Sequence, residues 1–301
     1  MTEKLKSFVK WVGGKRQLLT EIDKNLPDFE KENITTYVEP FLGGGAVLIH
    51  MLEKYNFKKY YASDLNEQLI STYLAIKNTP EELINQLRKL QTEYLNKPTI
   101  EEKKTFYLNK REEYNKKITT GDPSNQIPSL FIFLNKTGFN GLYRVNSKGQ
   151  FNVPFGHHNT PKILDEENLR NLHKAFQKVE FSIQGYEKTK QCAHKETFLY
   201  LDPPYRPLST SAAFTAYTNS SFNDTQQTEL ATFIKEQYDN GAHVLMSNSD
   251  PKNTNPNDTF FDDLYNWAEI QRVQASRAIN SKGTGRGKIN EILVKAYPKQ
   301  L

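Results

Sequence analysis

A proline-rich turn follows a short apolar run in the last third of the chain. The run is Thr197-Phe198-Leu199-Tyr200-Leu201, and Asp202-Pro203-Pro204-Tyr205 comes directly after it. Two prolines stiffen the turn and remove two N–H donors, while the carbonyl before each proline stays free to accept a hydrogen bond. The turn therefore offers a carboxylate, a rigid carbonyl and an aromatic face. This set suits an amino group on a flat ring, which Tyr205 would stack against.

A second candidate site is the glycine-rich turn Glu39-Pro40-Phe41-Leu42-Gly43-Gly44-Gly45. Glycines let a ligand approach the backbone, and the N-terminus of the helix predicted to follow favours an anion. A plain tight turn between a strand and a helix explains the same residues. The spacing matches neither G-x-x-x-x-G-K-[ST] nor G-x-G-x-x-G, which disfavours nucleoside triphosphate hydrolysis and a dinucleotide cofactor.

Asp64 ends the predicted strand Lys59-Tyr60-Tyr61-Ala62-Ser63-Asp64. It lies about 20 residues beyond the glycines, where an acid can accept hydrogen bonds from ribose hydroxyls. The alternative is that Asp64 caps the helical pattern that begins at Leu65. Strand, glycine turn, helix, strand and acid follow one another as in a nucleotide-binding half-sheet.

The elements that must position these residues alternate between strands and helices at both ends of the chain. We predict strands at residues 37–41, 59–64, 197–201, 242–248 and 290–296, and helices at 17–26, 46–55 and 226–238. This pattern predicts a doubly wound sheet. Between its halves we predict helices at 80–95, 100–114 and 127–134. A hairpin follows, in which residues 143–145 and 150–153 flank Ser147-Lys148-Gly149.

The basic excess of the chain lies in its middle. Residues 77–178 carry 17 Lys and Arg against 11 Asp and Glu, a net charge of +6, whereas the whole chain is +5. A local basic excess is a plausible footprint for a polyanion such as nucleic acid. An ordinary lysine-rich surface is the alternative.

Composition excludes several classes of protein. The 301 residues are 37% hydrophobic and 25% charged, unlike a disordered or collagen-like chain. No stretch approaches the ~20 apolar residues that span a bilayer. The charged start of the chain predicts no signal peptide, and the single Cys192 excludes an internal disulfide, so we expect a cytoplasmic protein. We expect His157 and His158 to be turn or phosphate residues, and no metal site.

Taken together, these motifs resemble the Dam-type family of DNA adenine-N6 methyltransferases over nearly the whole chain. The matching segments, in the family's order, are Phe8-Val9-Lys10-Trp11-Val12-Gly13-Gly14-Lys15, residues 38–45, Ser63-Asp64-Leu65-Asn66, Asp202-Pro203-Pro204-Tyr205, Leu245-Met246-Ser247-Asn248 and residues 286–291. Each motif is short, but a chance occurrence of all of them in this order is remote.

The resemblance implies S-adenosylmethionine as cofactor. Trp11 would supply an apolar or cation–π wall, Lys15 would hold the cofactor carboxylate, and Asp64 the ribose. Without the resemblance, Trp11 would be read as a core aromatic and Lys15 as a surface charge. Tyr186 would line the adenine pocket. The other cofactor-binding positions that the resemblance implies are Glu39, Pro40, Phe41, Gly43, Gly45 and Asp202.

The resemblance also implies the reaction. The target adenine of double-stranded DNA would flip into a pocket formed by the catalytic residues Asp202, Pro203, Pro204 and Tyr205, where its N6 takes the methyl group. Arg144 would contact guanine, Lys10 a base or phosphate, and Pro154 a thymine methyl. Phe139, Asn140 and Leu142 would wedge into the base stack. The stretch Asn140-Gly141-Leu142-Tyr143-Arg144 is similar to members that read GATC, so we predict GATC as the site.

The expected fold is therefore α/β: a Rossmann-like methyltransferase sheet with an inserted, mainly helical DNA-recognition domain that carries a β-hairpin. Residues 1–76 and 179–301 would form the catalytic domain, and residues 77–178 the insertion. Other DNA motifs, cytosine N4 and RNA adenine remain alternative targets, although similar N4-cytosine enzymes more often carry serine where Asp202 stands. A dinucleotide-dependent oxidoreductase and an inactive DNA-binding module are the alternatives from other classes. The oligomeric state stays open.

Overall fold

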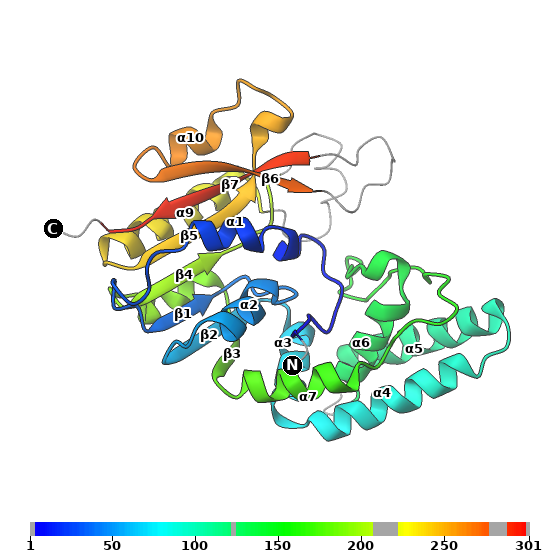
Figure 1. The fold of residues 1–301 in the computed structure, drawn as a ribbon. Coiled ribbons are helices and arrows are strands. Elements are labelled where there is room, and N and C mark those ends of the chain that lie inside the picture. Colours follow the sequence, from blue (N-terminus) through cyan, green and yellow to red (C-terminus); the bar gives the residue numbers. More distant parts are fainter. Residues whose placement is uncertain (1–3, 122–124, 207–221, 277–287, 299–301) are drawn as a thin grey trace. The chain divides into compact units, whose positions relative to one another are not determined.

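The computed structural model describes residues 4–121, 125–206, 222–276 and 288–298. The chain forms two compact units (Figure 1). The first comprises residues 1–14, 43–55 and 64–183, and the second comprises residues 15–42, 56–63 and 184–301. The domain boundaries at residues 77 and 178 stay a prediction.

The described helices and strands, in chain order, are α1 (Leu19–Lys24), β1 (Thr36–Glu39), α2 (Ala46–Lys54), β2 (Lys59–Asp64), α3 (Glu67–Asn78), α4 (Pro80–Leu95), α5 (Ile100–Thr120), α6 (Ile127–Thr137), α7 (Glu166–Phe176), β3 (Val179–Ile183), β4 (Thr197–Leu201), α9 (Asp224–Asp239), β5 (His243–Ser249), α10 (Phe260–Leu264), β6 (Glu269–Ser276) and β7 (Lys288–Ala296). Short 3-10 helices cover Lys15–Gln17, Phe139–Gly141, Tyr186–Cys192 and Pro251–Asn253.

The strands form a seven-stranded sheet in the order β3-β2-β1-β4-β5-β7-β6. β1 pairs in parallel with β2 and β4, and β4 pairs in parallel with β5. β7 is antiparallel to both β5 and β6. The chain order reverses between β1 and β4, which defines a doubly wound sheet. The predicted α/β, Rossmann-like sheet is therefore confirmed.

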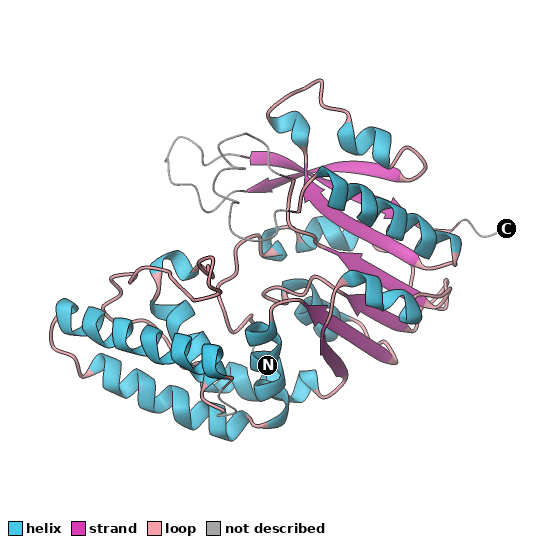
Figure 2. Cartoon of the chain, turned by 180° about the vertical axis from the view of Figure 1, so that it is seen from behind, coloured by secondary structure: helices cyan, strands magenta, loops and turns pink. Residues whose placement is uncertain are grey.

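The core of the second unit lies where α9 packs against the sheet. Every residue of β4 and of β5 is buried, as expected for strands covered on both faces. Leu230 and Ile234 of α9 join Leu199, Val244 and Ile292 in one apolar cluster. Figure 2 shows the strands side by side with a long helix lying over them.

Helix α6 is the centre of the first unit, since its residues from Pro128 to Asn135 are all buried. One face of α4 is apolar, with buried Leu83, Leu87 and Leu90 at helical spacing. Proline at the first position of α4 and a capping box between Thr99 and Glu102 in α5 fix where these helices begin.

The predicted hairpin after α6 is only partly confirmed. The turn is present, because Gly149 has a φ of 73° and its N–H donates to the Asn146 carbonyl at 2.9 Å. Its two arms pair through one antiparallel bridge, between Val145 and Phe151, and through backbone hydrogen bonds from Asn146 to Gln150 and from Asn152 to Arg144, but neither arm forms a regular strand. Bulky side chains at this turn pack together, with the Tyr143 and Phe151 rings 5.8 Å apart.

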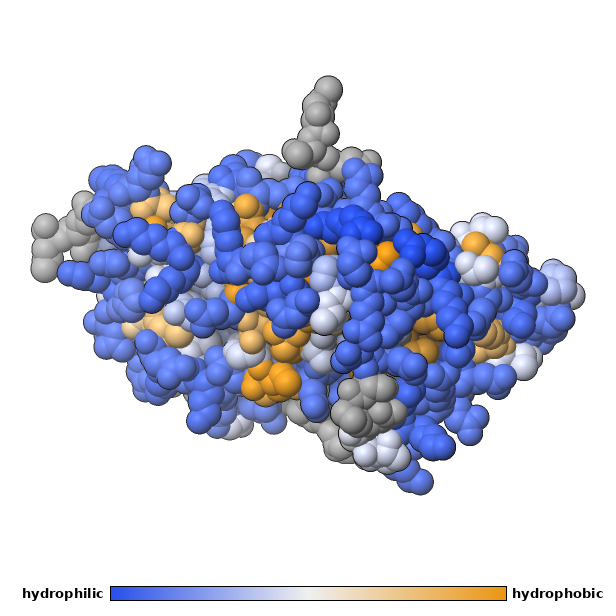
Figure 3. Space-filling model, turned by 90° about the horizontal axis from the view of Figure 1, so that it is seen from below, coloured by the Kyte–Doolittle hydropathy of each residue, from blue (hydrophilic) through white to orange (hydrophobic). Residues whose placement is uncertain are grey.

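Figure 3 shows a face that is mainly hydrophilic, with apolar residues in small separate patches. Among the described residues, no helix is both long enough and apolar enough to cross a membrane.

Candidate active site

The candidate catalytic turn, Asp202-Pro203-Pro204-Tyr205, follows β4 at the carboxyl edge of the sheet. Glu39 is the last residue of the neighbouring strand β1. The order of the strands reverses between β1 and β4, and ligands of doubly wound sheets bind outside the carboxyl ends of the strands at such a point. The fold therefore brings Glu39 and Asp202 to the expected position of a ligand site.

The Asp202 carboxylate is held by two side chains. Its Oδ1 lies 2.7 Å from Nζ of Lys15 and accepts a hydrogen bond of 3.1 Å from Oγ of Ser247. The Asp202 side chain is 20% exposed and that of Lys15 only 4%. Burial raises the pKa of the Asp202 carboxyl, and Lys15 and Ser247 act in the opposite direction. The arrangement orients a carboxylate that solvent, and therefore a substrate, can still reach.

Tyr205 lies against the same ammonium group. Nζ of Lys15 is 4.6 Å from the centre of the Tyr205 ring, and the Tyr205 hydroxyl donates to Oε2 of Glu291 at 2.5 Å. Burial, together with the charges of Asp202 and Glu291, raises the pKa of this hydroxyl above its ordinary value. The ring is thus anchored at its hydroxyl end by β7.

Glu39, at the end of β1, is buried and only 2% exposed. Its Oε2 accepts a hydrogen bond of 2.6 Å from the hydroxyl of Tyr37, and burial raises the pKa of that hydroxyl well above its ordinary value. The Tyr200 hydroxyl shares a hydrogen bond of 3.0 Å with Ser247. A buried polar layer therefore supports the carboxyl ends of β1, β4 and β5.

In the first unit, the glycine turn packs against Trp11. Gly43 and Gly45 have φ values of 47° and 65°, which favour glycine. A Cβ on Gly43 would lie 2.9 Å from the Trp11 indole, and one on Gly45 would collide with the hydroxyl of Tyr73. The close contacts of this turn with its own chain therefore already require glycine.

Asp64 is tied to this turn by backbone amides. Its Oδ2 accepts from the Gly43 N–H and its Oδ1 from the Asn66 N–H, each at 2.9 Å. Burial raises the pKa of the carboxyl, and these amides oppose the rise. The alternative that Asp64 caps the following helix is wrong, since Asn66 caps α3 by accepting from the Leu69 N–H.

Two aromatic residues predicted to bind the cofactor meet in the second unit. The rings of Phe41 and Tyr186 stack with their centres 5.5 Å apart, and Tyr186 also contacts Phe233 edge-on at 5.0 Å. Tyr186 belongs to the buried apolar cluster, and burial raises its pKa to about 12. Phe41 is the more exposed of the pair. Pro40 precedes it and is buried.

The predicted DNA-contacting residues gather in the first unit. Buried Asn135 joins them: its Oδ1 accepts from the Lys10 N–H at 2.8 Å, and its Nδ2 donates to the carbonyls of Lys10 and Gly141. The Phe139 N–H donates to the Pro154 carbonyl at 2.9 Å. The side chains of this group that are exposed include Lys10, Phe139, Asn140 and Pro154, whereas Leu142 is half-buried.

Arg144 lies on one arm of the turn at residues 146–149. Its Nε donates to Oδ1 of Asn152 at 2.7 Å, and its Nη2 to the Asn152 carbonyl at 3.2 Å. These bonds hold an exposed guanidinium across the turn. Arg144 is therefore positioned rather than free to swing.

Comparison with known proteins bears on this geometry. The model of the D12 class N6 adenine-specific DNA methyltransferases matches residues 11–279. The chain belongs to this family. A Type II methyltransferase, M.MjaIII, from Methanocaldococcus jannaschii is 44% identical over 97% of this chain and 99% of its own length. The DNA adenine methylase of Escherichia coli (strain K12) is 35% identical over 98% of this chain and 97% of its own.

Membership of the D12 class establishes the enzyme as an adenine-specific DNA methyltransferase, and DNA as its substrate. A further relative, the Type II methyltransferase M1.LlaDCHI from Lactococcus lactis subsp. cremoris, is 34% identical over 97% of this chain and 96% of its own. The predicted family, activity and substrate class are confirmed.

Three residues of this D12 methyltransferase support the site although the sequence predicted no role for them. Ser247 and Glu291 hold Asp202 and Tyr205, and Asn135 joins Lys10 to the turn after α6. Ser247 and Glu291 lie in matching segments, but only the fold brings them to the catalytic turn. Asn135 directly follows an apolar run, where a buried amide is unexpected without partners. Residues 286 and 287 of the last matching segment lie outside the described residues.

No group of three or more His, Cys, Asp or Glu side chains that could hold a metal ion occurs in the described part of the chain. His158 is half-buried, and burial lowers its pKa.

Proposed function

We propose that this D12 methyltransferase transfers the methyl group of S-adenosylmethionine to adenine N6 at GATC in double-stranded DNA. The supporting observation is the Asp202 carboxylate. It lies at the reversal of the strand order, oriented by Lys15 and Ser247, and is followed by a turn that presents Tyr205. A rigid hydrogen-bond acceptor beside an aromatic ring can bind a flipped-out base, because the acceptor takes a hydrogen bond from the exocyclic amino group and the ring stacks on the base.

The residues of the turn act on the amino group. Adenine N6 is a poor nucleophile because its lone pair is delocalised into the ring. Hydrogen bonds from N6 to the Asp202 carboxylate and the Pro203 carbonyl favour a pyramidal nitrogen with an available lone pair. When bound, S-adenosylmethionine supplies a methyl group on a sulfonium, so that the C–S bond breaks as the N–C bond forms. The surplus proton then leaves N6, and Asp202 need not be a strong base.

The residues present fit this cofactor. The Asp64 carboxylate accepts backbone N–H groups at both of its oxygens. A carboxylate has about four acceptor sites, so the three backbone amides that contact it leave room for a ribose hydroxyl. Phe41 and Tyr186 offer aromatic surface for the adenine ring. The other proposed contacts are Trp11, Glu39, Pro40, Gly43, Gly45 and Asp202. Lys15 is proposed for the cofactor carboxylate, although its ammonium pairs with Asp202 in the structure, so the two carboxylates would share it.

GATC recognition is proposed for the exposed side chains of the first unit. Arg144, held by Asn152, suits bidentate contact with guanine. Lys10 would contact a base or phosphate, and Pro154 a thymine methyl. Phe139, 48% exposed, would wedge into the stack with Asn140 and Leu142.

The test is to incubate the purified protein with S-adenosylmethionine and unmethylated plasmid DNA. Mass spectrometry identifies the modified base, and sequencing maps it. N6-methyladenine confined to GATC supports the proposal. N6-methyladenine at another motif overturns GATC as the recognition site, and with it the proposed contact of Arg144 with guanine. Methylated cytosine, or no modified base, overturns the assignment of the turn to adenine.

A further inference from the structure

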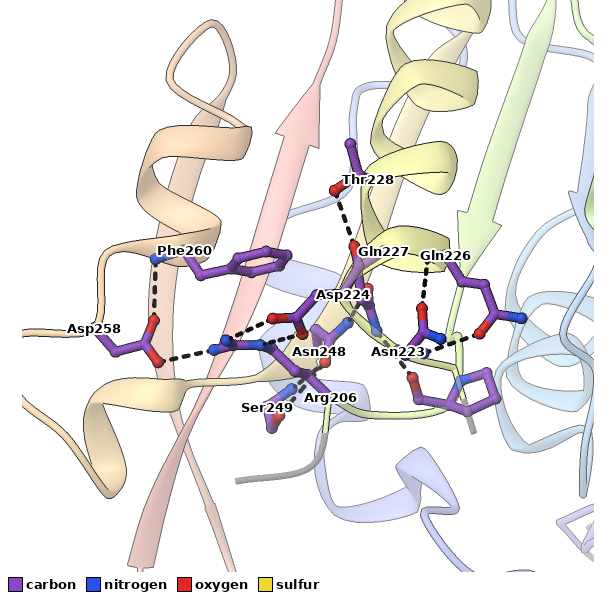
Figure 4. Close-up of polar contacts among 11 residues, drawn as sticks. Arg206, Asn223, Asp224, Gln226, Gln227, Thr228, Asn248, Ser249, Asp258 and Phe260 are labelled. Carbon is purple, nitrogen blue, oxygen red and sulfur yellow. Dashed lines mark hydrogen bonds and ion pairs between the residues drawn. The ribbon is translucent and has the colours of Figure 1, made fainter. Parts of the chain in front are cut away.

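Two neighbouring side chains of strand β5, Ser247 and Asn248, hold the candidate catalytic turn, one directly and one through Gln227. Successive side chains of a strand point to opposite faces. Ser247 donates to the Asp202 carboxylate at 3.1 Å, and the next residue, Asn248, donates through Nδ2 to Oε1 of Gln227 at 3.2 Å. Nε2 of Gln227 in turn donates to the Pro204 carbonyl at 3.1 Å (Figure 4). One strand therefore holds both the first residue of the turn and its third.

The turn needs a donor from outside itself. Pro203 and Pro204 have no N–H, so the local hydrogen bonds that fix most tight turns are missing here. The peptide plane that contains the Pro204 carbonyl also contains the N and Cα of Tyr205. A donor that fixes this carbonyl consequently fixes the direction from which the Tyr205 side chain leaves the backbone.

Gln227 is suited to this task. Gln227 and Asn248 are both 0% exposed, so solvent does not compete for their hydrogen bonds. The Gln227 amide accepts from Asn248 on one side and donates to Pro204 on the other. A primary amide does both at once, and Asn248 fixes which end of the amide faces the turn.

Arg206 fixes α9, and hence Gln227, relative to the turn. It directly follows Tyr205, and its Nε and Nη2 donate to the two carboxylate oxygens of Asp224 at 2.7 and 2.9 Å. Its Nη1 donates to Asp258 at 2.8 Å, and its guanidinium lies 4.3 Å from the centre of the Phe260 ring. Asp224 is the first residue of α9, one turn before Gln227 (Figure 4). Such bidentate pairs fix geometry as well as distance.

We propose that Gln227 is a positioning residue for methyl transfer, which fixes the peptide between Pro204 and Tyr205 while Arg206 sets the start of α9. This inference rests on the proposed roles of Asp202 and Tyr205 in catalysis.

The test is the isosteric variant Gln227→Glu, measured by single-turnover methyl transfer with saturating DNA and S-adenosylmethionine. The carboxylate still accepts from Asn248 but cannot donate to Pro204. We expect the transfer rate to fall roughly 10- to 100-fold, as for small displacements of reacting groups, with both dissociation constants within about 3-fold of wild type. A buried glutamate has a raised pKa and donates once protonated, so the ratio of variant to wild-type rate should rise as the pH falls.

Gln226→Glu is the matched control. Gln226 accepts from the Asn223 N–H in the capping box of α9, which a glutamate does equally well. We expect wild-type rates from it at every pH. A second variant, Gln227→Met, removes the donor without burying a charge, and it should lose rate with no rescue at low pH.

Wild-type rates from Gln227→Glu and Gln227→Met would overturn the proposal. So would loss of binding in proportion to rate in both variants, because that result indicates only a structural role. Rates are expressed relative to wild type on whichever base is methylated, with Asp202→Ala in parallel. A wrong assignment of the turn therefore shows in Asp202→Ala, and a wrong role for Gln227 shows in its own variants.

Discussion

Nζ of Lys15 lies 2.7 Å from Oδ1 of Asp202, although the two residues are far apart in the sequence. The ammonium is almost fully buried, and it also faces the Tyr205 ring. Burial alone would favour a neutral Asp202, and Lys15 opposes this by stabilising the carboxylate. Lys15 therefore acts on the two side chains that we propose for the reaction.

Replacement of Lys15 should shift the pH dependence of catalysis. Without the ammonium, the pKa of Asp202 rises further, so the ionised carboxylate forms only at higher pH. In Lys15→Met, the acidic limb of the single-turnover rate should move to higher pH by about one unit or more. Lys15→Arg keeps the charge and should shift less. An acidic limb at the wild-type position in Lys15→Met contradicts this role.

Tyr205 should act mainly through its ring. Stacking of a base on an aromatic side chain is worth about 1–3 kcal/mol. Tyr205→Ala should therefore weaken capture of the extrahelical base roughly 5- to 150-fold, measured with 2-aminopurine at the target position. Tyr205→Phe keeps the ring but loses the bond to Glu291, so its defect should be smaller. Equal defects in the two variants would show that stacking is not the main contribution.

Variants at Asp64 and Asn66 should distinguish the proposed cofactor contact from the capping of α3. Asp64→Ala should weaken S-adenosylmethionine binding, measured by calorimetry, because the proposed ribose acceptor is lost. Asn66→Ala removes the cap of α3 and should lower the free energy of unfolding by about 0.5–2 kcal/mol. It should leave cofactor affinity nearly unchanged. An unchanged dissociation constant in Asp64→Ala would leave the residue with only a structural role, through its bonds to backbone amides such as those of Gly43 and Asn66.

Arg144→Ala should relax sequence specificity. A bidentate contact with guanine discriminates between bases by about 1–3 kcal/mol. In the variant, the methylation rate at singly altered sites, relative to the rate at intact GATC, should therefore rise roughly 5- to 150-fold. Lys148→Ala, at an exposed position of the same turn, should weaken DNA binding alike for all sites. The recognition role of Arg144 fails if the variant methylates intact and altered sites with wild-type relative rates.

Strong local signals predicted much of the fold. The bounds of β2, β4 and α4 agree with prediction, because β2 and β4 are short apolar runs and α4 begins with proline. β6 was not predicted, since its polar residues pair with one strand only, at the edge of the sheet. β3 is likewise an edge strand, and its mixed sequence gives no clear period.

The site was predicted less completely than the fold. Motif resemblance selects Asp202, Lys15 and Tyr205, but it does not show that Lys15 and Asp202 pair. That contact depends on long-range packing, which no local pattern encodes. Gln227 gives even less signal, as one of two adjacent glutamines in an amphipathic helix. Its role follows only from its bond to Pro204.

The central claim is that the Asp202 carboxylate accepts a hydrogen bond from the amino group of the target adenine. The most direct test is the single-turnover methyl-transfer rate of Asp202→Ala on duplex GATC DNA, together with its affinities for DNA and S-adenosylmethionine. The account predicts affinities close to wild type and a rate lower by about 100-fold or more, as for loss of one preorganised polar contact in a transition state. A near-normal rate in the folded variant would contradict it.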